Sequence, residues 1–236
     1  MPKGLDFKTF EEKADKEGLV WEEKEQFERA INAYDRLLAE AEAFCPTSQL
    51  ENNEKNAIMA YLLMRKAGVL LQTGKAELGE QLMHQALKHA EKSGNSIVIA
   101  RAKLGVGVFY GSTGRLEKGE RLLDAALLLF EKGTDYDSKQ GYGWALLNLG
   151  GLYLKQGKLV QAEKKLLEAI KVLESIENWM GVASAYELKA NVNDAKSLAN
   201  LAREDMLKAI SFYEKQGIME KASSLRKNME KMSTSP

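Results

Sequence analysis

Apolar residues along the chain recur at helical spacing, and breaks in that pattern come at regular intervals. Between Thr47 and Ser235 there is no proline, and helix-forming residues such as Ala, Leu, Glu and Lys predominate. Glycine-containing breaks occur at Gly74, Gly114 and Gly157, which lie 40 and 43 residues apart. The pattern predicts an all-α chain, and the even spacing of its breaks predicts a repeated pair of helices.

Each copy places small residues where two helices would approach closely and a Tyr or Leu one helical turn away. This is a packing rule, so it predicts shape and carries no chemistry. The same spacing of small and large residues recurs in the neighbouring copies and, more weakly, near the N-terminus. In the copy that follows the clearest one, Ser197 replaces the turn glycine. That clearest copy contains Leu149, Gly150, Tyr153, Gly157, Ala162, Leu166 and Ala169.

This copy resembles the tetratricopeptide repeat, with two departures: Leu146 takes the tryptophan position and Glu174 takes the closing proline position. The usual period is about 34 residues, so the longer period and the triplet Asn148-Leu149-Gly150 make the chain similar to kinesin light chain, LGN-type modulators and peptide-sensing bacterial regulators. The resemblance implies a right-handed α-solenoid of antiparallel helix pairs, a TPR-like superhelix with a C-terminal capping helix. It also implies binding of extended or helical peptide segments.

We expect one TPR-like domain over residues 1–236. The loop around Cys45 and Pro46 marks the one irregular connection, and the last helix is polar on most faces, as a cap requires. The approximate repeats are residues 5–44, 53–94, 96–133, 138–177 and 179–217, followed by a capping helix at 218–232.

In such arrays the first helix of each pair lines the concave face, which predicts the residues of the groove. The predicted lining is mainly apolar with a few polar groups, a composition suited to a peptide or an amphipathic helix. The predicted partner-binding residues are Tyr61, Met64, Arg65, Leu71, Arg101, Leu104, Val108, Trp144, Leu147, Asn148, Lys155 and Asn191.

Two of these residues have a second interpretation of nearly equal weight. Trp144 on the inward face has the profile of a binding hot spot, and it is equally suited to packing in the core. Asn148 has a donor and an acceptor for a peptide backbone, or for a bond to an adjacent helix.

Arg65, Arg101 and Lys155 suggest a cationic lane for an acidic ligand, although simple exposure to water explains them as well. The carboxylate clamp of chaperone-tail-binding relatives is absent, because that clamp needs Lys or Asn where this chain has Met64, Gly68 and Gly105.

The total charge argues against nucleic acid as a partner. The 34 Lys+Arg equal the 34 Asp+Glu, and nucleic-acid affinity needs clustered cations. Residues 1–44 carry 12 acids and 7 bases, a balance of −5, and residues 196–236 carry 5 acids and 8 bases, a balance of +3. This asymmetry suggests head-to-tail self-association or an acidic N-terminal helix over the groove, with solvated helix faces as the alternative.

No combination of residues indicates an enzyme, a metal site or a cofactor. His84 and His89 are five residues apart, which does not suit a ligand pair on one helix face, and we expect them on the surface. Cys45 has no neighbouring base in the sequence, and the glycines at Gly105 and Gly107 lack the Gly-Lys-Ser/Thr of a phosphate loop.

The first residues contain no apolar targeting segment, and no apolar run approaches the roughly 20 residues of a membrane span, so we expect a cytoplasmic location. The expected function is a protein–protein interaction adaptor or scaffold that binds a partner's peptide or helical segment. The alternatives are a structural or oligomerisation subunit that uses the convex face or the ends, and a peptide-sensing regulator.

Overall fold

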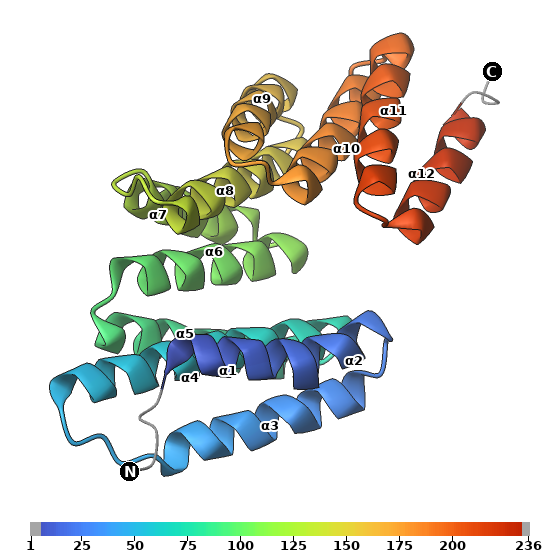
Figure 1. The fold of residues 1–236 in the computed structure, drawn as a ribbon. Helices are drawn as coiled ribbons and strands as arrows, with labels where there is room; N and C mark the ends of the chain where they lie inside the picture. Colours follow the sequence, from blue (N-terminus) through green and yellow to red (C-terminus); the bar gives the residue numbers. More distant parts are fainter. Residues whose placement is uncertain (1–5, 233–236) are drawn as a thin grey trace. The chain divides into compact units, whose positions relative to one another are not determined.

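The computed structural model describes residues 6–232, which form helices and the short connections between them (Figure 1). No strand occurs in this part of the chain, so the predicted all-α class is confirmed. In chain order the helices are α1 (Phe7–Ala14), a π-helical stretch (Asp15–Leu19), α2 (Val20–Glu23), α3 (Phe27–Ala43), α4 (Gln49–Gln72), α5 (Ala76–Ser93), α6 (Ser96–Ser112), α7 (Leu116–Phe130), α8 (Tyr136–Lys155), α9 (Leu159–Ser175), α10 (Trp179–Ala195), α11 (Ala199–Lys215) and α12 (Met219–Met232).

Tight turns fold consecutive helices back on each other. In these turns Gly74, Gly114 and Gly157 have φ angles of 78°, 80° and 71°, a left-handed conformation that glycine adopts without a clash at Cβ. Ser197 takes the same role between α10 and α11 with φ of 60°. The helices of the pairs α4/α5, α8/α9 and α10/α11 make extensive contacts with each other.

The first helix of most pairs begins at a side-chain cap. The Asn95 carboxamide accepts a hydrogen bond from the Ile97 amide at 2.9 Å, and the Asp135 carboxylate accepts one from the Ser138 amide at 3.0 Å. The second helices α5, α9 and α11 have no side-chain cap. Their starts are set by the turn that precedes them.

The chain forms two compact units, which we call unit 1 (Met1–Ala126) and unit 2 (Leu127–Pro236). The boundary falls inside α7. The single domain and the repeat bounds expected from the sequence stay predictions.

Small residues allow close helix packing in unit 1. A Cβ atom at Gly18 would lie 2.4 Å from Tyr34 Cε1, and one at Gly107 would lie 2.9 Å from Leu123 Cγ. Tyr34 and Leu123 are almost wholly buried, so these glycines make room for core side chains of the paired helix.

The same rule holds in unit 2. A Cβ atom at Gly150 would lie 2.6 Å from the buried Leu166 Cγ, and one at Gly143 would lie 2.7 Å from Leu173. Helix α12 packs on α11 through buried side chains, and its serines face solvent. These positions are Ala222 and Leu225 on the buried side and Ser223 and Ser224 on the exposed side. The capping role expected of this helix stays a prediction.

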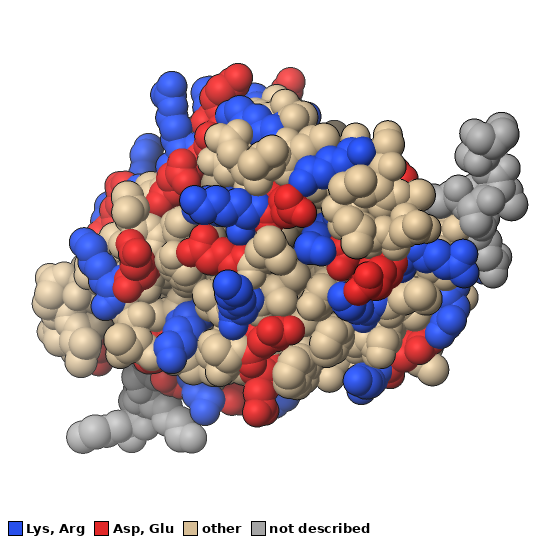
Figure 2. Space-filling model, turned by 90° about the horizontal axis from the view of Figure 1, so that it is seen from above, with Lys and Arg blue, Asp and Glu red and all other residues tan. Residues whose placement is uncertain are grey.

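Lys/Arg and Asp/Glu side chains are interspersed on the face drawn in Figure 2. This distribution agrees with the equal numbers of acids and bases in the sequence. None of the helices in residues 6–232 is long and apolar enough to cross a membrane.

Candidate partner-binding site

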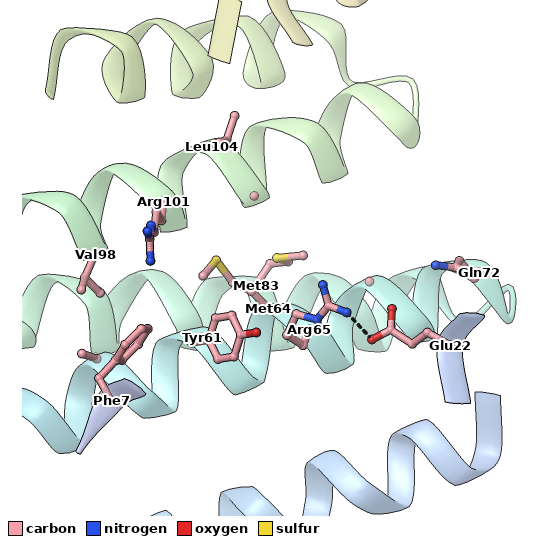
Figure 3. A pocket seen from close by; sticks show the side chains of 13 residues that line it. Phe7, Glu22, Tyr61, Met64, Arg65, Gln72, Met83, Val98, Arg101 and Leu104 are labelled. Carbon is pink, nitrogen blue, oxygen red and sulfur yellow. Dashed lines mark hydrogen bonds and ion pairs between the residues drawn. The ribbon is translucent and has the colours of Figure 1, made fainter. Parts of the chain in front are cut away.

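Unit 1 contains a cavity of about 460 Å³ (Figure 3). Three successive first helices contribute to its wall: the α1/α2 segment, α4 and α6. Met83 of α5 is the only lining residue from a second helix among the described residues. The cavity is lined by Phe7, Glu22, Ala57, Tyr61, Met64, Arg65, Gly68, Gln72, Met83, Val98, Arg101, Leu104 and Gly105.

Most of this wall is apolar, and two glycines keep it hollow. The rings of Phe7 and Tyr61 pack edge to face with centroids 5.7 Å apart. A Cβ atom at Gly68 would meet nothing within 4 Å, and one at Gly105 would meet only Met64. The missing side chains on α4 and α6 therefore leave space that an apolar group can fill.

A polar cluster lies at the α2 end of the cavity. Arg65 Nη2 donates to Glu22 Oε1 at 2.9 Å, and the Tyr34 hydroxyl donates to the same oxygen. Arg65 Nε also donates to the Tyr34 hydroxyl at 3.3 Å. Burial and the bond to Glu22 raise the pKa of the Tyr34 phenol, so it keeps its proton and remains a donor. These contacts hold Arg65 in place.

The part of the wall formed by α6 carries a second arginine, Arg101. Arg101 Nη1 lies 3.9 Å from Glu11 Oε1 of α1, an ion pair longer than a hydrogen bond. Figure 3 shows the Arg101 guanidinium directed into the cavity toward the rings of Phe7 and Tyr61. Burial raises the pKa of Tyr61 to about 12, so its phenol is neutral at physiological pH.

Contacts with α3 and α4 position the α1/α2 segment. The Phe7 backbone amide donates to Glu54 Oε1 at 2.6 Å, and Lys13 of α1 pairs with Glu40 of α3. Gly18 lies in the π-helical stretch and fits against Tyr34, as described above. The segment is thereby placed so that Phe7 and Glu22 both face the cavity.

The structure brings five of the twelve predicted binding residues together in this cavity. The remaining unit 1 residues, Leu71 and Val108, are half-buried outside its lining. Whether any of these residues contacts a partner stays a prediction. The five in the cavity are Tyr61, Met64, Arg65, Arg101 and Leu104.

The other predicted residues lie in unit 2 and line none of its described cavities. Trp144 is half-buried and packs on a hydrophobic cluster that includes Leu147, which is only 6% exposed. Asn148 Nδ2 donates to the Trp144 carbonyl at 2.8 Å within the same helix. Leu147 is therefore part of the core in this structure, and the Asn148 amide donates within its own helix. Which of the two interpretations of Trp144 holds stays a prediction. Lys155 and Asn191 are exposed.

Several lining residues were outside the sequence prediction. Phe7 and Glu22 belong to the front copy, whose match to the repeat is the weakest, and Met83 belongs to a second helix. The sequence predicts neither Gly68 nor Gly105 as a groove residue, because both depart from the carboxylate clamp and Gly105 lacks the context of a phosphate loop. Their common signal is glycine at a groove-facing position of two successive first helices, which indicates a hollow.

The two histidines and the cysteine do not line the cavity. His84 is exposed and lies 3.2 Å from the Tyr110 hydroxyl, whereas His89 lies 2.8 Å from Asn56 Oδ1. His89 is half-buried, because its helix packs on α4, and so it lies only partly at the surface. Cys45 is exposed with a free thiol. No group of His, Cys, Asp and Glu side chains suited to a metal ion occurs in residues 6–232.

Comparison with known proteins agrees with this architecture. Residues 98–175 match the tetratricopeptide repeat family. No curated protein is significantly similar to it in sequence.

Solved structures show that the repeat fold extends well beyond the matched segment. BtubC (BKLC) from P. vanneervenii has a TM-score of 0.65 at 15% identity, over 88% of this chain and 91% of that one. A putative kinesin light chain from Podospora anserina with nearly identical TPR-like repeats has 0.60 at 12%, over 92% and 99%. A Rap protein complexed with Competence and Sporulation Factor has 0.51 at 16%, over 92% and 72%. Identities this low show the fold alone, and they confirm the α-solenoid class.

Proposed function

We propose that the chain is a protein-interaction module, an adaptor or scaffold, whose unit 1 cavity receives apolar side chains from a segment of a partner protein. The cavity itself carries this proposal. Its volume of about 460 Å³ lies within the range of about 300–1,000 Å³ that is usual for binding sites, and its wall is mostly apolar.

The identity of the wall residues supports a partner side chain as the occupant. Met64 and Met83 are flexible and polarizable, so they adapt to the shape of an inserted group. Phe7 and Tyr61 offer aromatic faces and edges. Grooves of this kind receive the apolar face of an amphipathic helix or the alternate side chains of an extended peptide.

The comparisons support the same class of function. The tetratricopeptide repeat supports a role in protein–protein interaction, and one similar structure, the Rap protein, is complexed with Competence and Sporulation Factor. A non-catalytic role and a cytoplasmic location belong to this proposal, and the single free cysteine is compatible with that compartment.

Gly68 gives a direct test, because it lines the cavity and its missing side chain faces open space. A phage library of random dodecapeptides would be selected on the whole chain and counter-selected on Gly68→Phe. We expect peptides that bind the natural chain, measured by fluorescence anisotropy, and that lose binding when the introduced phenyl ring fills the cavity.

Gly68→Ala is the matched control. It adds one methyl group in open space and stabilises an interior helix position by about 1 kcal/mol or less, so it should fold and keep the binding. If every selected peptide binds Gly68→Phe as well as the natural chain, the cavity is not the binding site. Light scattering on the same samples reports self-association, the route by which a structural subunit would act.

A further inference from the structure

The cavity of unit 1 is long and runs beside α4. Its lining residues on this helix extend from Ala57 to Gln72, which corresponds to about 22 Å at about 1.5 Å per residue. Those on α6 extend from Val98 to Gly105, which corresponds to about 10 Å. Figure 3 shows Val98 at one end of the cavity and Gln72 at the other. A cavity of this length has room for several side chains from one face of a partner segment.

The charged side chains of the wall are balanced by groups of the same unit. Arg65 donates to Glu22 at 2.9 Å, and Arg101 pairs with Glu11 at 3.9 Å and makes a further interaction. Two bases of the wall are thus offset by two acids. The apolar surface between them matches the uncharged stripe of an amphipathic helix.

The wall also has few polar groups to offer the backbone of an occupant. Of its charged or hydrogen-bonding side chains, only those of Tyr61 and Gln72 make no hydrogen bond or ion pair to another described residue. The backbone groups inside α4 and α6 are bonded within their own helices.

This shortage distinguishes the two conformations that a bound segment can have. An extended segment of about 22 Å contains about seven residues, each with a backbone donor and a backbone acceptor. Most of those that face the wall would lose water without gaining a partner, which is unfavourable. A helix bonds its own backbone and needs only an apolar surface.

We propose that the occupant of the cavity is an amphipathic helix of the partner, which lies along α4 with its bulky apolar side chains in the hollow beside Gly68 and Gly105. A helix of about 15 residues, or four turns, has the length of the cavity. This inference rests on the proposed function, because it names the conformation and the chemistry of the segment that the cavity receives.

The two glycines allow the partner helix to come close. A Cβ atom at Gly68 would meet nothing within 4 Å, and one at Gly105 would meet only the Met64 side chain, with Sδ at 3.0 Å. Helices pack by inserting the side chains of one into the grooves of the other, and a missing side chain deepens such a groove. Met64 and Met83 are flexible enough to adjust to the inserted side chains.

The closing experiment uses dodecapeptides selected as above, each first scanned with alanine. Three further versions are then made. One carries α-aminoisobutyric acid, which favours a helical backbone, at two positions where alanine has no effect. The second carries proline at its centre, and the third carries proline at its first residue. Fluorescence anisotropy measures their affinity for the natural chain, for Gly68→Ala and for Gly68→Phe, so that binding in the cavity is separated from binding elsewhere.

We expect α-aminoisobutyric acid to tighten binding about three- to ten-fold, because the helix is then formed before it binds. Proline at the centre should weaken binding at least about ten-fold, since it breaks a helix, whereas proline at the first residue should have little effect. The alanine scan should lose affinity at positions three or four residues apart.

An extended occupant would give the opposite results, namely weaker binding with α-aminoisobutyric acid, tolerance of the central proline and sensitive positions two residues apart. Those results, in peptides that lose binding to Gly68→Phe, overturn this inference and leave the proposed function standing. If no selected peptide depends on the Gly68 cavity, the proposed function fails and this inference fails with it.

Discussion

His89 shows how one half-buried side chain links stability to pH. Its Nδ1 lies 2.8 Å from Asn56 Oδ1, an acceptor, so this nitrogen carries the proton in the neutral ring. Burial and then the nearby Lys92 lower the pKa of His89 below its ordinary value of 6.5, with Lys55 acting the same way and Glu42 opposing them. The unfolded chain therefore binds this proton more readily than the folded chain does.

The sign of the pH effect follows from this difference. The stability associated with neutral His89 is present above pH 6.5 and is lost as the pH falls toward the lower pKa of the folded state. We expect the denaturation midpoint of His89→Gln to fall less than that of the natural chain between about pH 7.5 and about pH 5.5. Urea titrations at the two pH values measure this. An equal fall of the midpoint in His89→Gln and in the natural chain would contradict the assignment.

The pairing of α10 with α11 depends on a buried polar cluster as well as on apolar contacts. Asp205 Oδ2 accepts from Lys189 Nζ at 2.6 Å and from Asn193 Nδ2 at 2.7 Å. Asp205 is 2% exposed and Asn193 is 1% exposed, so neither has water as an alternative partner. The cluster joins the middle of α11 to the C-terminal half of α10.

Removing the Asp205 carboxylate should weaken this helix pair more than removing an exposed charged side chain would. In Asp205→Ala the amine of Lys189 and the amide of Asn193 lose their acceptor in a nearly dry site, and the free energy of unfolding should fall by about 3–5 kcal/mol. The adjacent Glu204 is exposed and pairs only along its own helix, with Lys208, so Glu204→Ala should leave the urea midpoint unchanged. Equal midpoints for the two variants would show that the buried pair contributes nothing.

The sequence predicts the helices well because their signals are local. Apolar periodicity marks the helix faces, and turn glycines such as Gly74 and Gly157, or Ser197 in their place, mark the ends. The cavity is harder to predict, because it depends on Phe7 and Glu22 from the front copy, which contains a π-helical stretch and departs from the repeat frame. Trp144 is ambiguous for another reason: the pattern fits a groove residue and a core residue equally, and in the structure its side chain is half-buried against a hydrophobic cluster.

At the scale of the whole molecule, each unit has a hydrophobic core of its own. One cluster in unit 1 surrounds Tyr34 and Leu62, and one in unit 2 surrounds Leu146 and Leu173. In repeat proteins each element depends mainly on its nearest neighbours, so local unfolding can stay local. Stability should therefore differ between the units when only one core is damaged.

Two matched core substitutions test this independence. Leu62→Ala in unit 1 and Leu173→Ala in unit 2 both remove a wholly buried leucine side chain, each at a cost of about 2–5 kcal/mol. In hydrogen exchange followed by mass spectrometry, we expect Leu173→Ala to lose protection in α8, α9 and α10 and to keep it in α4 and α5, with peptide binding at the Gly68 cavity retained. Leu62→Ala should give the reverse pattern and weaken that binding. Uniform loss of protection over the whole chain in both variants would mean that the molecule unfolds as one cooperative body, and that the cavity depends on distant repeats as much as on its own.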